Sequence, residues 1–139
     1  MIVLDTNVIS EPLRPSPDLR VVRWLDAQPP TILYTTALTV AELRTGVAVM
    51  ADGRRRDHLR ERLEDTVLPY FEGRVLPFDL SAATSWATMV SRARAAGRPL
   101  PVMDSLIAAV ARSRGYALAT RNTGDFVDTG VDLVNPWED

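Results

Sequence analysis

The chain opens with a short apolar run, Ile2-Val3-Leu4, which ends at an acidic residue, Asp5. An apolar run of this kind, closed by a charge, is typical of a buried strand in a parallel sheet. Four further short runs follow along the chain, and segments with helical signals separate them. Strands that alternate with helices predict an α/β fold with three layers, α/β/α, around a five-stranded parallel sheet. The five predicted strands are 2–4, 31–35, 75–78, 116–120 and 131–134.

The segments between these strands carry the signals of helix starts and ends. Ser16-Pro17 predicts an N-cap followed by proline at the first helical position, and Gly115 predicts a helix end. The predicted helices are 7–13, one that starts at 16–17, 39–50, 53–71, 81–96 and 104–114. Because no repeat, linker or low-complexity tract interrupts this pattern, residues 1–139 predict a single domain.

The composition excludes several classes of chemistry. The chain has 139 residues and no cysteine, which rules out disulfides, thiolate zinc sites and cysteine nucleophiles. Its single histidine, His58, excludes a ribonuclease mechanism that needs two histidines. All 16 basic residues are arginine, and a chain without lysine is neither a P-loop kinase nor a Schiff-base enzyme.

Charge and hydropathy constrain the partners. The net charge is −2, so a nucleic acid would be held locally, in a cleft, because proteins that coat nucleic acids are strongly basic. The first residues lack the basic region of a signal peptide, and the longest uncharged stretch, 27–41, is too short to span a bilayer. We therefore expect a cytoplasmic protein without a membrane segment.

Four acidic residues lie on segments that follow predicted strands: Asp5, Glu42, Asp104 and Asp125. The carboxyl ends of parallel strands meet at one edge of the sheet, where ligands bind. Carboxylates that converge there repel each other, by about 4 kcal/mol for a pair ~4 Å apart at an effective dielectric of ~20. A set of oxygen ligands suits Mg²⁺ or Mn²⁺, which can activate water and neutralise charge on a phosphodiester.

Each acid also has a structural interpretation. Glu42 could complete a capping box with Thr39, Asp104 could be an N-cap, and Asp125 could be a turn residue. Asp5 could cap the helix that follows it. The spacing of the four acids leaves both interpretations open.

Four segments, in this order and at this spacing, carry a resemblance to a known family. They are Leu4-Asp5-Thr6-Asn7, Ala41-Glu42-Leu43, Pro101-Val102-Met103-Asp104-Ser105-Leu106-Ile107-Ala108-Ala109 and Thr120-Arg121-Asn122-Thr123-Gly124-Asp125-Phe126. Together they resemble PIN-domain ribonucleases, most strongly the VapC and FitB type toxins of bacterial toxin–antitoxin pairs. The resemblance covers the chain from Met1 to about Trp137.

The resemblance implies a Mg²⁺- or Mn²⁺-dependent endoribonuclease that forms homodimers and binds an antitoxin, whose tail blocks the cleft. Matched by position, the catalytic metal site would be Asp5, Glu42, Asp104 and Asp125, and the supporting hydrogen bonds would come from Asn7, Thr120 and Asn122. Asp5 and Asp104 are the leading ligands, and Asp125 would act through water or on a second metal. Specificity for RNA rests on the resemblance alone, because a water nucleophile does not need the ribose 2′-hydroxyl.

Two other interpretations use the same features. A phosphotransfer domain or a non-catalytic binding module could also place an acidic cleft at a sheet edge, although the absence of lysine counts against the first.

The cluster Arg54-Arg55-Arg56 predicts either a solvated helix with ion pairs or an arm that faces RNA or a partner.

Overall fold

The computed structural model describes residues 1–138 and has a five-stranded sheet in the order β3-β2-β1-β4-β5, with every pair parallel. The strands are β1 (Ile2–Leu4), β2 (Leu33–Thr36), β3 (Val75–Leu76), β4 (Ala117–Ala119) and β5 (Leu133–Val134). The predicted five-stranded parallel sheet is confirmed. The chain adds strands on one side of β1 and then crosses to the other side at β4, so the topological switch point lies between β1 and β4.

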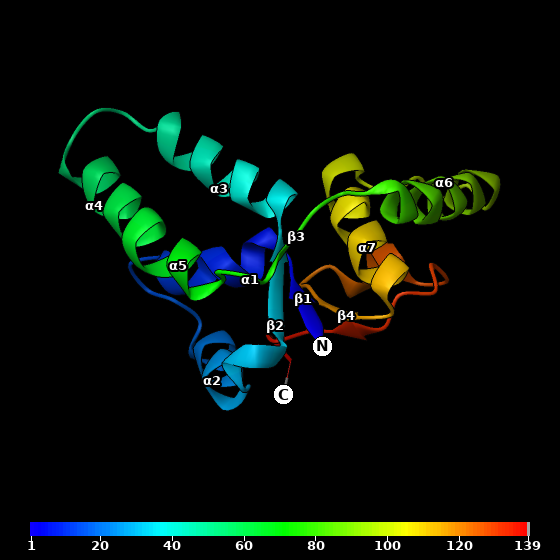
Figure 1. Cartoon of the computed structure of the whole chain (residues 1–139), viewed down its shortest axis with the longest axis horizontal. Coiled ribbons are helices and arrows are strands. Elements are labelled where there is room, and N and C mark those ends of the chain that lie inside the picture. The colour runs from blue at the N-terminus through cyan, green and yellow to red at the C-terminus, as the bar shows by residue number, and fades with distance from the viewer. Residues whose placement is uncertain (139) are drawn as a thin grey trace.

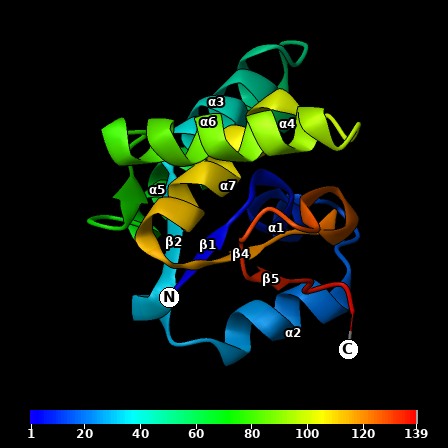
Figure 2. The ribbon, with the colours of Figure 1, turned by 90° about the vertical axis from the view of Figure 1, so that its right-hand side faces the viewer.

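Side chains alternate between the two faces of the sheet, as the strand pleat requires. Val3 and Leu118 pack on one face with α6 (Leu80–Ala95) and α7 (Val102–Arg114). Leu4 and Ala119 pack on the other, with α1 (Thr6–Ser10), α2 (Leu19–Ala27) and Phe71, which follows α5 (Leu68–Tyr70). The two groups of helices lie on opposite sides of the sheet (Figure 1), and the turned view shows α6 and α7 above it and α2 below (Figure 2). The three-layer prediction is confirmed.

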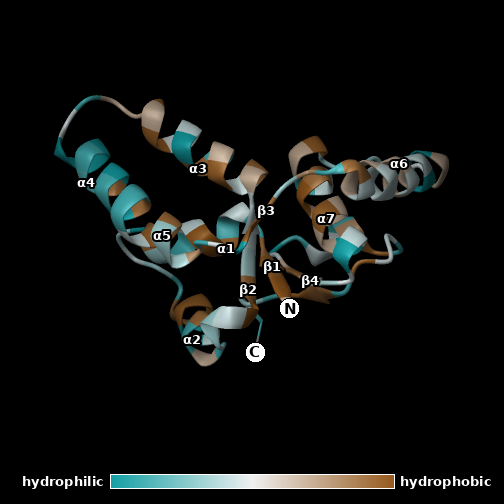
Figure 3. Ribbon diagram, viewed as in Figure 1, coloured by the Kyte–Doolittle hydropathy of each residue, from teal (hydrophilic) through white to brown (hydrophobic). Residues whose placement is uncertain are grey.

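Two helices project beyond the sheet as a hairpin (Figure 1): α3 (Ala37–Ala48) and α4 (Arg54–Arg62). Helix α4 continues through a π-helical turn, Leu63–Val67, into α5. Arg44 of α3 donates two hydrogen bonds to Glu64, at 2.9 and 3.0 Å, which tie the two arms of the hairpin together. Helix α4 is hydrophilic along most of its length (Figure 3), so most of its surface faces solvent.

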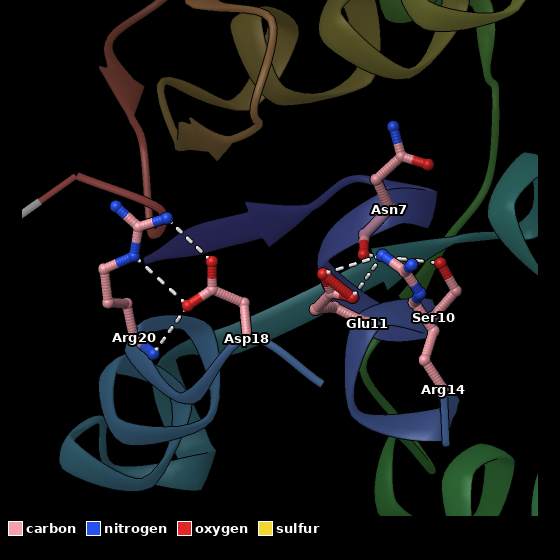
Figure 4. A network of polar contacts seen from close by, with 6 residues as sticks. All are labelled: Asn7, Ser10, Glu11, Arg14, Asp18 and Arg20. Atoms are coloured by element: carbon pink, nitrogen blue, oxygen red, sulfur yellow. Dashed lines mark hydrogen bonds and ion pairs between the residues drawn. The ribbon is translucent and has the colours of Figure 1, made fainter. Parts of the chain in front are cut away.

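Several helix starts differ from the predictions because a better cap lies nearby. Helix α2 begins at Leu19, where the Asp18 carboxylate accepts the Arg20 N–H at 3.0 Å and also pairs with the Arg20 guanidinium (Figure 4). The predicted Ser16 cap is therefore wrong. Helix α3 begins at Ala37, two residues early, because the Thr36 hydroxyl accepts the Thr39 N–H at 3.1 Å.

The connection after α1 holds a buried charge. The chain turns there through a 3₁₀ helix, Glu11–Leu13, and Glu11 is only 4% exposed. Both of its carboxylate oxygens lie 3.2 Å from Nη1 of Arg14 (Figure 4). A buried carboxylate needs such a partner, so this pair fixes the turn that leads away from the sheet edge.

Among the helices of residues 1–138, none combines the length and the apolar character needed to cross a membrane.

Candidate active site

Asp5 lies at the carboxyl end of β1, on the switch point, and is 5% exposed. Its backbone N–H donates to the carbonyl oxygen of Ala119 at 3.0 Å, which extends the pairing of β1 with β4. Its Oδ1 accepts the Val8 N–H at 3.0 Å and so caps α1. Burial raises the pKa of Asp5, and the nearby charge of Asp104 adds to this, against hydrogen bonds from Thr120 and two backbone amides. Asp5 therefore caps α1 and is also a buried carboxyl group whose pKa is raised.

Thr120 supports Asp5 from the neighbouring strand. It follows β4 directly, is buried, and its hydroxyl lowers the pKa of Asp5 as a hydrogen-bond donor. The backbone N–H of Asn122 in turn donates to Oγ1 of Thr120 at 3.2 Å. The predicted support from Asn122 thus runs through its backbone, while its side chain is exposed. Asn7 is exposed as well, and its side-chain amide points away from the Glu11–Arg14 pair (Figure 4).

Asp104 is the third residue of α7 and does not cap it. The helix begins at Val102, after Pro101, so the N-cap interpretation of Asp104 is wrong. Burial raises the pKa of the Asp104 carboxyl, and the charges of Glu42 and Asp125 raise it further. The charge of Asp104 in turn raises the pKa of Asp5. Asp104 is therefore the acid that interacts electrostatically with each of the other three.

Glu42 lies on the second turn of α3, and its Oε1 accepts a hydrogen bond from the Thr6 hydroxyl at 2.5 Å. The capping-box interpretation is wrong, since Thr36, not Thr39, caps the helix. The hydroxyls of Thr6 and Thr39 lie 3.4 Å apart, and those of Thr36 and Thr39 lie 3.3 Å apart. Because Thr6 gives its one proton to Glu42, Thr39 is the donor toward Thr6. A chain of hydroxyls thus orients the Glu42 carboxylate.

The hydroxyl chain of Thr6, Thr36 and Thr39 was not predicted, and Thr39 was expected only as a possible capping partner of Glu42. Thr6 comes one residue after Asp5, and Thr36 ends β2. The signal was the same one that identified the acids, a polar side chain at the carboxyl end of a strand.

Asp125 lies in a short 3₁₀ helix, Thr123–Phe126, and is exposed. Its backbone N–H donates to the Asn122 carbonyl at 3.1 Å, as expected for a turn residue. Its charge nevertheless reaches Asp104 and raises the pKa of that carboxyl. Asp125 is therefore a turn residue that also contributes to the negative electrostatic potential of the site.

The donor chemistry fits a hard cation that keeps most of its water. Within residues 1–138, no group of three or more Asp, Glu, His or Cys side chains is arranged so that together they could hold a metal ion. The acids are coupled through Asp104 instead, and all the donor atoms are oxygens. Mg²⁺ is typically bound by one or two carboxylates and several waters, so an open set of this kind suits it. A cation here would also neutralise the charge that raises the pKa of Asp5 and Asp104.

The three arginines at the start of α4 have different environments. Arg56 pairs with Asp52 and lies 3.9 Å from Asp57, which agrees with the ion-paired helix. Arg54 is exposed. Arg55 lines a groove of about 750 Å³ that Thr6 and Glu42 also line, so it is the one of the three that borders the acidic site.

The comparison with known proteins decides the family. The family model described as PIN domain matches residues 2–131. The chain belongs to the PIN domain family. This PIN domain is 50% identical over 138 residues to "VapC ribonuclease Y4jK" of Sinorhizobium fredii, with 99% of both chains covered. It is 49% identical over 139 residues to "Toxin FitB" of Neisseria gonorrhoeae, with 100% of both covered. It also superposes with a TM-score of 0.95 on a chain in the structure of FitAB bound to IR36 DNA, at 47% identity, covering 99% of this chain and 96% of that one.

Proposed function

We propose that this PIN domain is a Mg²⁺- or Mn²⁺-dependent endoribonuclease that acts as the toxin of a toxin–antitoxin pair in the cytoplasm. The observation that carries the proposal is the coupling of Asp5, Glu42 and Asp125 to Asp104 beside the β1–β4 switch point. The relative named VapC ribonuclease, 50% identical over 99% of this chain, supports RNA as the substrate.

In the proposed mechanism, Asp5 and Asp104 would hold the cation, and Glu42 would complete the site. The cation would supply acidity to a bound water and neutralise charge on the phosphodiester. Thr120 keeps the buried Asp5 carboxylate in place, and Thr6 does the same for Glu42 from across the site. One Glu42 oxygen is held by Thr6, which leaves the other to accept a proton or orient water. Asp125 is exposed, and its negative charge acts on Asp104.

The first test is the chemistry of the products. We expect purified protein to cut single-stranded or loop RNA and to leave 5′-phosphate and 3′-hydroxyl ends, because water is the nucleophile and no second histidine is present. EDTA should stop cleavage, and Mg²⁺ or Mn²⁺ should restore it. A 2′,3′-cyclic phosphate end would exclude a water nucleophile, and cleavage that persists in EDTA would exclude the cation. A non-catalytic module would be indifferent to Mn²⁺.

Substitutions rank the acids. Asp5→Asn and Asp104→Asn should abolish cleavage while the protein stays folded. Asp125→Asn should lower the rate by roughly 10- to 100-fold, the usual effect of a group outside the direct ligands. Asp65→Asn is the matched control, since Asp65 is an exposed acid on the π-helical turn. An inactive Asp125→Asn beside an active Asp5→Asn would reverse this ranking.

The proposed protein partner is a small antitoxin that places an arginine or lysine among the acids. Burial raises the pKa values of Asp5 and Asp104, the charges of neighbouring acids raise them further, and a basic side chain would neutralise those charges in place of a metal. The relative named Toxin FitB and the FitAB complex support this partner. Pull-down from the native host should recover a small inhibitory protein, and light scattering should give the mass of a homodimer. Recovery of no small partner at native expression would contradict the toxin assignment.

A further inference from the structure

A second cavity, of about 440 Å³, opens beside the acidic site and is separate from the Glu42 groove. It lies between the C-terminal end of α6, the loop to α7 and the loop 124–129, and Asp125 forms part of its wall. Its volume lies within the range of about 300–1,000 Å³ typical of sites that bind small molecules. Leu100, two residues before the start of α7, and Asp125 both line the cavity, and Asp104 lies in the first turn of α7, so the cavity adjoins the acidic site.

The walls of the cavity combine apolar surface with two arginines and two aspartates, Arg92, Arg98, Asp125 and Asp128. Met89, Leu100 and Val127 supply the apolar part, and Val127 is 52% exposed. Arg98 lies 3.7 Å from Asp128, so its charge is offset. Arg92 also lines the cavity, and within residues 1–138 it has no ion-pair partner. The apolar part of the wall can contact a nucleobase, and the Arg92 guanidinium can bind the phosphate joined to it.

The loop that forms one wall is held in a defined shape. Phe126 is anchored in the core at 2% exposed, and its carbonyl accepts the buried Thr129 hydroxyl at 2.6 Å. Asp128 has a φ of 66°, a left-handed conformation that aspartate adopts more readily than most non-glycine residues. The cavity is therefore formed before any ligand arrives.

We propose that this cavity binds one nucleotide of a single-stranded RNA, next to the phosphate held at the acidic residues. The base lies against Val127, Leu100 and Met89, and Arg92 binds the phosphate on the far side of that base. The inference rests on the proposed endoribonuclease function, and it assigns the direction in which the RNA strand leaves the site.

Binding is measured with Mg²⁺ on an Asp5→Asn background, where the RNA is not cut. Arg92→Gln should weaken binding and reduce the slope of log affinity against log salt by about 0.7, the value for one phosphate contact to a single strand. Arg94→Gln is the matched control, because Arg94 is exposed in the same last turn of α6 but does not line the cavity. It should leave the slope unchanged.

An abasic scan locates the base. A series of RNAs, each lacking one base, should show one position next to the cut bond where affinity falls roughly fivefold or more. Val127→Asn should remove that dependence without changing the melting temperature. Equal salt slopes for Arg92→Gln and Arg94→Gln, or a flat abasic scan, would overturn the proposal even if the parent cleaves the RNA. The proposal would also be overturned if Arg92→Gln weakened the binding of the inhibitory protein but left the binding of RNA unchanged. Failure of the parent to cleave any RNA would instead overturn the proposed function.

Discussion

Asp5 is under two opposing demands. Its carboxylate accepts the Val8 N–H at 3.0 Å and a hydrogen bond from Thr120, which favour the charged form. Burial and the charge of Asp104 act the other way and outweigh them, because the pKa of Asp5 is raised. A capping residue that served only α1 would have no need for a second acid beside it. The charged form of Asp5 therefore destabilises the metal-free fold, through burial first and through repulsion from Asp104 second.

We expect Asp5→Asn to melt at or above the temperature of the metal-free parent. Asparagine can still accept the Val8 N–H, and it removes the charge. Most substitutions destabilise, by about 0.5–3 kcal/mol, so the sign is informative. Mn²⁺ at a hundredfold excess over its dissociation constant should stabilise the parent by about 2.7 kcal/mol and the variant much less. Thermal melts of both proteins in EDTA and in Mn²⁺ measure this, and equal Mn²⁺ shifts would remove Asp5 from the site.

At the scale of the elements, the site depends on how α1 and α3 meet. Helix α3 carries Glu42, and its start is set by the Thr36 cap. Thr6, on α1, reaches across to both Glu42 and Thr39. The hydroxyl chain thus fixes the distance between β1, which bears Asp5, and the helix that bears Glu42.

Thr6→Val tests this link, because valine keeps the shape of threonine and removes the hydroxyl. We expect it to lower the free energy of unfolding by about 1 kcal/mol, the typical net value of one hydrogen bond. The Mn²⁺ dissociation constant should rise roughly tenfold, as for other groups that orient ligands. Calorimetric titration with Mn²⁺ measures this without RNA. Thr6→Ser, which keeps the donor, is the control, and a Thr6→Val protein with parental Mn²⁺ affinity would show that Thr6 does not position Glu42.

The strands and the helix end at Gly115 could be predicted from the sequence, while the N-caps of α2 and α3 could not. Runs such as Ile2-Val3-Leu4 identify strands because burial on both faces requires an apolar run. Ser16 and Thr39 were plausible caps, yet Asp18 and Thr36 hold those positions, because the choice depends on which side chain meets the free N–H groups in the folded chain. The predicted capping box of Thr39 and Glu42 is a local sequence pattern. It does not form because β2 ends at Thr36, and the Thr36 side chain caps α3 instead. The hydroxyl chain joins α1 to α3 and has no local signature.

At the scale of the whole molecule, the topology gathers charges that are far apart in the sequence. Asp5 and Asp104 are separated by 99 positions, yet the charge of Asp104 raises the pKa of Asp5, and the charges of Glu42 and Asp125 raise that of Asp104. Elsewhere, acids have partners that lower their pKa: Arg20 lowers that of Asp18 to about 2, and Arg44 lowers that of Glu64. The two groups of acids therefore act on stability in opposite directions as the pH changes.

We expect the stability of the metal-free protein to fall as the pH rises from about 4, the ordinary pKa of aspartate, through the raised values of Asp5 and Asp104. Their folded forms hold protons more tightly than the unfolded chain does, so ionisation favours unfolding. Asp18 and Glu64 lose stabilising charge only at lower pH, so they do not produce this slope. Urea unfolding in EDTA between pH 4 and 7 measures it. The double substitution Asp5→Asn with Asp104→Asn should flatten the curve of stability against pH, and Asp18→Asn should leave that curve unchanged. Saturating Mn²⁺ should reverse the sign of the slope, because the metal binds the ionised carboxylates. A metal-free stability that rises over this range would show that the acids do not repel one another in the folded chain.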